Sequence, residues 1–213
     1  METLALLGTV LGIGFVSGIN LYATVLAIGV AIRFGLITLD PAYESLAILG
    51  DPIVIGAAGL MYVCEFVADK VPWFDSFWDV IHTAIRPVGA AVLASMAVGS
   101  VDPATEIAAI LLSGTVALTS HSVKAGTRVL ANHSPEPFSN IALSLFEDVL
   151  AFGGTVLLLM NPILMLVLVV AFIGVFIWLF PKLVRLLRSS LRKVAGWFRK
   201  RPAESVPQNA LPQ

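Results

Sequence analysis

The sequence EFVADKVPWFDSFWDVIHTAIR, residues 65–86, is a polar stretch in a chain that is otherwise strongly apolar. A second polar stretch, SHSVKAGTRVLANHSPEPFSNIALSLFED, covers residues 120–148. Ionisable side chains are costly within a membrane, and those that occur there usually line a cavity or a pathway. The two stretches therefore predict where the function of the protein lies, although they do not identify a substrate.

The composition is that of a membrane protein. The 213 residues are 58% hydrophobic and 13% charged, and the mean hydropathy is +0.92. We therefore predict an all-α, polytopic membrane helix bundle, with residues 1–181 as one transmembrane domain. Cys64 is the single cysteine, so an intrachain disulfide is excluded. No glycine-rich phosphate loop or nucleic-acid motif is present, and neither a cofactor nor a nucleic-acid partner is predicted.

The first apolar segment, residues 3–34, is too long for one simple span. The run SGIN at residues 17–20 interrupts it, and a break at membrane depth survives only where it faces protein or a cavity. We therefore predict a broken first helix, which is retained rather than cleaved as a signal peptide because no cationic region precedes it. Five further spans bring the expected total to about six: 52–69, 74–99, 104–131, 138–160 and 162–181.

The distribution of charge over the loops predicts the orientation. Six spans place both termini on one side of the membrane. The basic side chains on that side are Lys70, Lys124, Arg128 and those of the tail, whereas the acidic ones on the other side are Asp40, Glu44, Asp51, Asp102 and Glu106. By the positive-inside rule, both termini are cytoplasmic in a multi-pass protein of the inner (cytoplasmic) membrane, and both polar stretches lie in the cytoplasmic half of the bilayer.

The C-terminal segment is strongly basic. Residues 182–201 place apolar side chains along one helical face and Lys or Arg over much of the remainder, which indicates an interfacial helix that binds anionic lipid. A plain stop-transfer flank accounts for the same charge. Residues 202–213 contain three prolines and are predicted to be disordered.

Helical spacing aligns the polar side chains of each stretch on one face of its helix. Four such stripes would be poorly solvated by lipid, so we expect them to face one another, with acids against bases. Together with Asn20 and Lys70, the stripes form the predicted ion or substrate site. Their members are Glu65 and Asp69; Asp75, Asp79, His82 and Arg86; His121, Lys124, Arg128 and Asn132; and Asn140, Glu147 and Asp148.

Two chemistries are compatible with these side chains. In the first, Arg86 and Arg128 hold an anionic group such as a lipid phosphate. Protons would then be exchanged by His82, Glu147 and Asp148. In the second, a metal ion is bound, because a carboxylate and an imidazole one helical turn apart are a known pattern in helix bundles. The candidate metal ligands are Asp79, His82, His121 and Glu147.

Several short motifs combine in a specific way. They are SGINLYAT at 17–24, ADKVP at 68–72, WD with HT and IRP between 78 and 87, and SHS with KA and TR between 120 and 128. With these motifs, residues 5–160 resemble a family of bacterial integral-membrane proteins called domain of unknown function 4126. The resemblance implies a membrane protein in which these motifs matter, and it implies no activity.

The favoured hypothesis is a small transporter or flippase-like protein, which six spans would form more easily as a homodimer. One alternative is a structural or assembly factor in which the polar stripes are a buried ion-pair network. The other is an intramembrane enzyme, either metal-dependent or a lipid-phosphate hydrolase. The hydrolase would use Arg86-Pro87, Ser120-His121 and Arg128 with His133, which resemble elements of membrane acid phosphatases at an unsuitable spacing. No catalytic residue is predicted.

Overall fold

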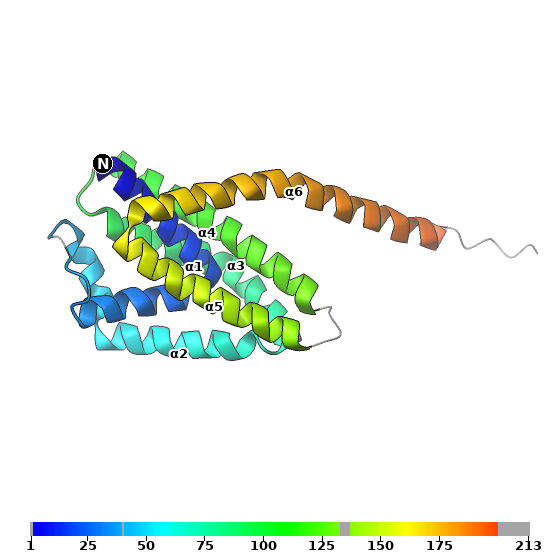
Figure 1. Ribbon diagram of the computed structural model, residues 1–213, viewed down its shortest axis with the longest axis horizontal. Helices are drawn as coiled ribbons and strands as arrows, with labels where there is room; N and C mark the ends of the chain where they lie inside the picture. The colour runs from blue at the N-terminus through cyan, green and yellow to red at the C-terminus, as the bar shows by residue number, and fades with distance from the viewer. Residues whose placement is uncertain (1, 40, 133–136, 200–213) are drawn as a thin grey trace, which may run out of the picture. The chain divides into compact units, whose positions relative to one another are not determined.

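The computed structural model describes residues 2–39, 41–132 and 137–199, and this part of the chain is helical without strands (Figure 1). Its elements are α1 (Glu2–Arg33), the 3-10 helix η1 (Pro41–Gly50), α2 (Pro52–Ala68), α3 (Pro72–Val98), α4 (Pro103–Asn132), α5 (Pro137–Met160) and α6 (Pro162–Arg199). Five helices are long and apolar enough to cross a membrane, or six if η1 and α2, which are bent by 63°, count as one span. The predicted membrane helix bundle is confirmed.

Proline marks the start of every element after α1. It suits the first helical position, because its fixed φ is helical and its missing N–H would have no intrahelical partner there. An Asp or Asn commonly precedes it as the cap: Asp51 Oδ1 accepts from the backbone N–H of Ile53 over 2.7 Å, and Asn161 Oδ1 accepts from that of Leu164 over 2.9 Å. These Asx-Pro pairs fix the helix starts locally, which is why the spans match the sequence prediction closely.

α1 is broken at Asn20, which has φ −153° and ψ 102°. The Asn20 side chain caps the second half of the helix, since its Oδ1 accepts from the N–H of Ala23 over 2.9 Å. Thr24 Oγ1 donates to the Asn20 carbonyl over 2.9 Å. Asparagine is a strong N-cap residue in this extended conformation, so the predicted break occurs where a helix end can be satisfied internally.

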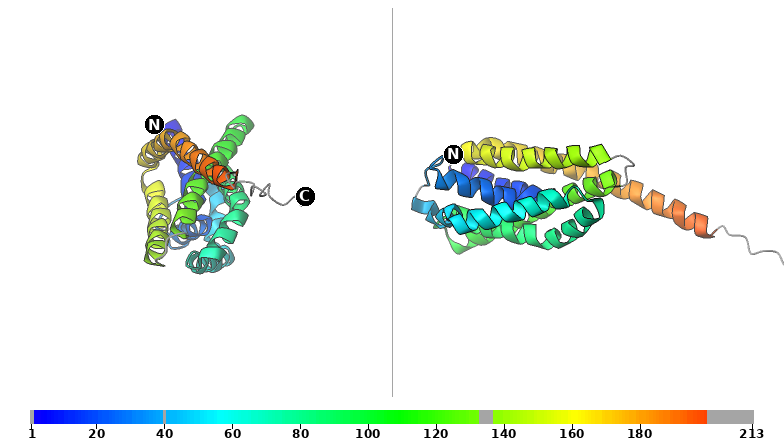
Figure 2. Two further views of the ribbon diagram at one scale, coloured as in Figure 1. Left: turned by 90° about the vertical axis from the view of Figure 1, so that its right-hand side faces the viewer. Right: turned by 90° about the horizontal axis from the view of Figure 1, so that it is seen from below.

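The two halves of α1 form a re-entrant hairpin. Gly8, near the start of α1, lies against Pro162 at the start of α6, and Gly29, beyond the break, lies against Leu49 just before α2. Both ends of α1 therefore lie at the end of the bundle where α2, α4 and α6 begin, and Asn20 is the tip inside the bundle (Figures 1 and 2). We call the end of the bundle where α3 and α5 begin, and where α2 finishes, the charged end. The end that holds both ends of α1 is called the opposite end.

The reversal bears on the predicted topology. By length and composition α1 qualifies as a span, but it enters and leaves the bundle at one end. The prediction of two cytoplasmic termini counted α1 as a crossing, whereas both of its ends lie at the same end of the described bundle. Hydropathy does not distinguish a kinked span from a hairpin, because both bury the same apolar residues.

Close packing holds the hairpin within residues 1–169, which form one compact unit. α1 contacts α2, α3, α4 and α5, whereas the paired helices α2–α3 and α4–α5 make few direct contacts (Figure 2). Gly14 lies against the backbone of Ser113, and Gly18 lies against Ala117 and Ser120 of α4. Small residues allow such close approach between membrane helices. α1 is thus the centre of the bundle.

Residues 170–213 form a second unit. α6 continues as one helix through Pro181 to Arg199, so the predicted span 162–181 and the predicted interfacial helix are one helical element. Lys182 Nζ lies 3.0 Å from the centroid of the Trp178 ring. The side chains beyond Arg185 and the predicted disordered tail, residues 202–213, lie outside the described part of the chain. Binding of anionic lipid by this helix stays a prediction.

Candidate functional site

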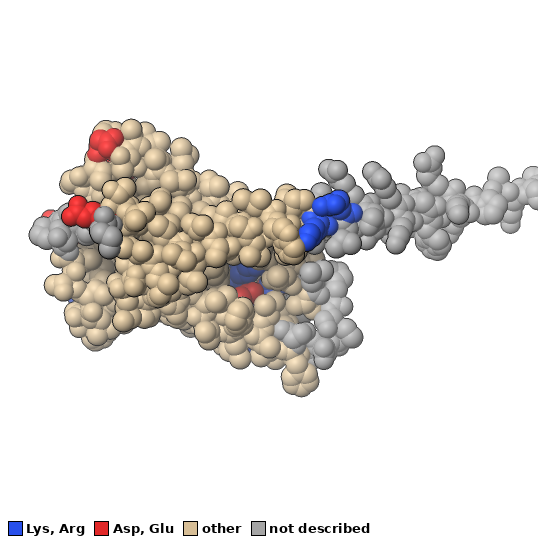
Figure 3. Space-filling model, turned by 45° about the horizontal axis from the view of Figure 1, so that its top comes forward, with Lys and Arg blue, Asp and Glu red and all other residues tan. Residues whose placement is uncertain are grey.

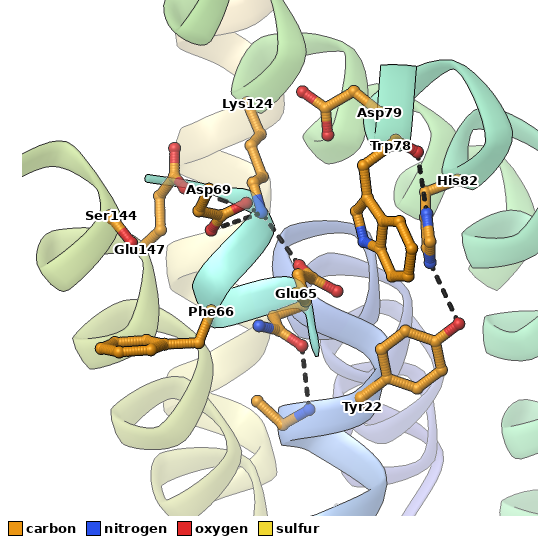
Figure 4. Close-up of polar contacts among 12 residues, drawn as sticks. Tyr22, Glu65, Phe66, Asp69, Trp78, Asp79, His82, Lys124, Ser144 and Glu147 are labelled. Carbon is orange, nitrogen blue, oxygen red and sulfur yellow. Dashed lines mark hydrogen bonds and ion pairs between the residues drawn. The ribbon is translucent and has the colours of Figure 1, made fainter. Parts of the chain in front are cut away.

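Charged and polar side chains from α2, α3, α4 and α5 converge inside the bundle near its charged end (Figure 4). None of them exposes more than 8% of its surface. The four polar stripes thus face one another, as the cost of exposing them to lipid requires. We call this group the charged cluster, and its members are Glu65, Asp69, Asp75, Asp79, His82, Arg86, His121, Lys124, Arg128, Asn140, Glu147 and Asp148.

Arg86 connects the cluster to the tip of α1. Its Nη2 donates to Glu65 Oε1 over 2.7 Å, and Asp79 Oδ1 lies 3.9 Å from the same nitrogen. Its Nη1 donates to His121 Nδ1 over 2.8 Å and to the carbonyl oxygen of Gly18 over 2.9 Å. That carbonyl belongs to the end of the first half of α1, where the helix dipole favours a cation. Arg86 therefore satisfies the broken helix and ties it to α2 and α4.

Lys124 lies between three carboxylates. Its Nζ donates to Glu65 Oε1 over 3.0 Å and lies 3.6 Å from Asp69 Oδ2 and 3.6 Å from Glu147 Oε2. Figure 4 shows the amino group directed toward Glu65 and Asp69. A compact ammonium with three donors suits such sharing, so one cation of α4 balances acids of α2 and α5.

Arg128 is held in a rigid geometry by both α5 and the end of α2. Its Nε lies 3.1 Å from Glu147 Oε1, and its Nη2 lies 2.6 Å from Glu147 Oε2. Nη2 also lies 2.9 Å from Asp69 Oδ2, while Nη1 donates to Asn140 Oδ1 over 2.9 Å. Asp75 Oδ1 is 3.9 Å from Nε. A bidentate pair of this kind is among the strongest side-chain interactions.

The hydrogen-bond partners determine the tautomer of His121. An arginine only donates, so the Nδ1 that faces Arg86 accepts; a backbone carbonyl only accepts, so the Nε2 that lies 3.0 Å from the Asp79 oxygen carries the hydrogen. His121 is therefore neutral and both ring nitrogens are occupied. This leaves it without a free lone pair for a metal or for attack on phosphorus.

His82 lies at the side of the cluster next to α1. Its Nδ1 donates to the Trp78 carbonyl over 2.8 Å, and its Nε2 lies 3.0 Å from the Tyr22 hydroxyl. Trp78 also stacks on the imidazole, with ring centroids 4.7 Å apart (Figure 4). Tyr22 is not among the site residues predicted from the sequence; its position two residues after the helix break was the available signal.

Asp148 and Lys70 lie at the margin of the cluster. The Tyr62 hydroxyl is a neutral polar group that interacts with Asp148. Lys70 Nζ donates to the Phe66 carbonyl over 2.9 Å and to Ser144 Oγ over 3.4 Å. Burial lowers the pKa of the Lys70 amino group, an effect that the negative charges of Asp148 and Asp69 partly oppose. Lys70 is half-buried, unlike the fully enclosed Lys124.

The cluster contains more acids than bases. Among the described residues, six carboxyl groups are buried, against three buried bases, and Lys70 adds a fourth base at the margin. Glu65 Oε2, Asp148 Oδ2 and Arg86 Nε are buried without a hydrogen-bond partner. An unpaired buried charge costs several kcal/mol per ion. The basic side chains of the charged cluster are too few to neutralise all of its carboxylates.

The structure brings together every predicted site residue whose side chain it describes. Asn20 lies at the tip of α1 next to the charged cluster, and Lys70 lies at the margin of the cluster. The side chain of Asn132, and all of His133, lie outside the described part. No group of three or more His, Cys, Asp or Glu side chains among the described residues is arranged to hold a metal ion. The predicted metal candidates are instead occupied by hydrogen bonds and ion pairs.

Figure 3 shows acidic and basic atoms at the bottom of a recess in a surface that is otherwise largely uncharged. At the opposite end lies a mainly apolar cavity of about 660 Å³. Both halves of α1 line it, through residues that include Leu6, Thr9, Ile13 and Ile28. The cavity does not include the charged cluster; the hairpin tip lies between the two.

The chain belongs to the family described as domain of unknown function (DUF4126), whose family model matches residues 7–182. This confirms the resemblance seen in the sequence motifs and extends it beyond residue 160 into the apolar part of α6. No curated protein and no solved structure matches the chain. The family description names no activity, so any function must be argued from the site.

Proposed function

We propose that this protein is a small transporter or flippase-like protein, with its site at the charged cluster. The class of substrate is an ion, a small anion or a lipid headgroup. The observation that carries the proposal is that a re-entrant hairpin ends, at Asn20, against a buried cluster of charges. Discontinuous helices whose ends meet polar groups near the midplane are a recurring feature of transporters, because irregular backbone at membrane depth must line protein or a cavity.

The proposal also gives the membrane orientation. We place the charged end at the cytoplasmic side of the inner membrane, because Lys70, Lys124 and Arg128 lie toward it and the acidic loop residues Asp51 and Asp102 lie toward the other. α1 returns to its own side, so the N-terminus is on the external side. This replaces the expectation of two cytoplasmic termini.

Cysteine labelling in intact cells tests this orientation. In a Cys64→Ser background, single cysteines at Thr3 and Asp102 are expected to react with an impermeant maleimide from outside, because both belong to the opposite end. A cysteine at Val71, which is 46% exposed at the charged end, should react only after permeabilisation. Labelling of Asp102→Cys only in permeabilised cells would reverse the orientation, and labelling of Thr3→Cys together with Val71→Cys would contradict the hairpin.

A flux assay tests the transport proposal. The purified full chain is reconstituted in vesicles, and the movement of K⁺, Na⁺, H⁺, inorganic phosphate and fluorescently labelled phosphatidylglycerol is followed. At least one probe is expected to cross faster than in protein-free vesicles. Lys124→Gln should lower that rate by about tenfold or more, because a loss of 1.4 kcal/mol in binding is already a factor of ten. Arg33→Gln, which alters a base outside the cluster, is the matched control. Movement of no probe in folded protein would count against transport.

The structural alternative has one observation in its favour: all three buried bases are already ion-paired inside the bundle. This alternative predicts a different result for an exchange of charges in the Arg128–Glu147 pair. If the cluster only locks helices together, the exchange Arg128→Glu with Glu147→Arg should restore the stability that either single change removes and leave function intact. If the cluster carries substrate, the double variant should fold and still lose flux.

A further inference from the structure

We propose that Asp148 is a proton-binding site of the charged cluster, which takes up and releases a proton at the charged end during transport. The inference rests on the proposed function and specifies its ion. It selects Asp148 from the three residues, His82, Glu147 and Asp148, for which the sequence alone indicated proton exchange.

Asp148 differs from the other acids of the cluster in its partners. Within the described part of the chain, the other five buried acids each have a basic nitrogen within 4.0 Å, but Asp148 has none. It is 8% exposed, its Oδ2 has no hydrogen-bond partner, and Tyr62, which interacts with it, is a neutral group. A buried carboxylate without a cation is strongly disfavoured, whereas the neutral acid costs far less to bury.

The surroundings of Asp148 oppose a negative charge on balance. The polar and charged groups that act on it are Tyr62, Glu65, Asp69 and Lys70, from α2 and the residues after it, and Lys124 from α4. Lys124 is shared among three other carboxylates, and Lys70 is bonded to a carbonyl and a hydroxyl. Neither cation is therefore assigned to Asp148, and the nearby acids add repulsion.

A proton fits this site better than a metal ion. No set of three or more His, Cys, Asp or Glu side chains among the described residues has the arrangement that a metal needs. A proton requires a single carboxyl group, and it removes one of the surplus negative charges of the cluster. The other two candidates are less suitable: Glu147 is fixed by the bidentate contact with Arg128, and both ring nitrogens of His82 have partners.

The proton site is connected to the tip of α1. Tyr62, the partner of Asp148, packs against the cluster formed by Ile19, Ala23 and Ala151. Ile19 and Ala23 lie on either side of the helix break. A change in the charge of Asp148 alters its interaction with Tyr62, which packs against residues on either side of the helix break. Protonation of Asp148 can thus influence the tip of the hairpin through Tyr62.

Infrared difference spectroscopy of the full chain in liposomes tests the assignment. The wild type is expected to show the carbonyl stretch of a protonated carboxyl group at mildly acidic pH, which shifts in D₂O and disappears as the pH is raised. Asp148→Asn should remove this band, while Asp102→Asn, at an exposed helix cap, should keep it. Asp148→Glu retains a carboxyl group and should shift the band rather than remove it. Absence of the band in wild type, or its persistence in Asp148→Asn, would overturn the proposal.

Stability and flux separate this inference from the proposed function. Asn has the shape of a neutral Asp, so Asp148→Asn is expected to unfold at the wild-type temperature, whereas a structural charge at Asp148 would make it less stable and overturn the assignment. Probe flux together with a titrating band that depends on Asp148 supports both proposals. Flux without such a band overturns the proton site alone. The band without flux of any probe supports the proton site and overturns transport.

Discussion

Replacement of Arg86 by leucine is expected to lower the free energy of unfolding by about 3–5 kcal/mol, the usual cost of removing one partner of a buried ion pair. Arg86 is fully buried, and its loss leaves Glu65 with Lys124 as its remaining basic partner. It also leaves the Gly18 carbonyl without its donor at the end of the first half of α1. Both groups would then be polar and underpaired in a low-dielectric interior.

The measurement is unfolding of the purified protein in detergent, by denaturant and by heat, with Arg33→Leu as a control outside the cluster. The double variant Arg86→Leu with Glu65→Leu is expected to recover part of the loss, because it removes the unbalanced carboxylate with the base. Wild-type stability in the single variant would show that the contacts of Arg86 do not support the fold.

Gly18→Ala is expected to destabilise the protein by about 1–3 kcal/mol, the range for overpacking a close contact. A Cβ at Gly18 would lie well inside contact distance of Ser120 Oγ and of the Ala117 carbonyl oxygen. The second of these is backbone, so the clash is relieved only if α1 and α4 separate. That movement also displaces the Gly18 carbonyl from Arg86, and flux should therefore fall together with stability.

Gly126→Ala is the matched control for this substitution. Gly126 also lies in a helix, but a Cβ there would have no atom within 4 Å. Because alanine is the better helix former by roughly 1 kcal/mol, this change is expected to be neutral or stabilising. Thermal unfolding of the two variants side by side distinguishes steric exclusion from the general effect of losing a glycine. Equal behaviour of the two would show that close approach at Gly18 is not required.

Local chemistry explains what could be predicted from the sequence. Helix starts depend on residues next to one another, as at Asp51-Pro52 and Asn161-Pro162, and the boundaries were accordingly predicted to within a few residues. The break near Asn20 is likewise encoded locally, by residues that weaken helix and can cap it. Helical periodicity placed the polar residues of each helix on one face, and the cost of exposing them to lipid predicted that these faces would meet.

Only the tertiary structure decided which charged side chains pair with one another and in which direction the chain runs after the break in α1. The sequence placed Glu147 and Asp148 side by side as equivalent acids, yet the bundle gives Arg128 to Glu147 and only Tyr62 to Asp148. The sequence also predicted the break in α1 but not its reversal, nor the end of the bundle at which the N-terminus lies. The direction of the chain after Asn20 is set by distant contacts, with Gly29 against Leu49 and Gly18 against α4. Such contacts join residues that no local pattern relates, and only their simultaneous packing determines whether an apolar segment crosses the bundle or returns.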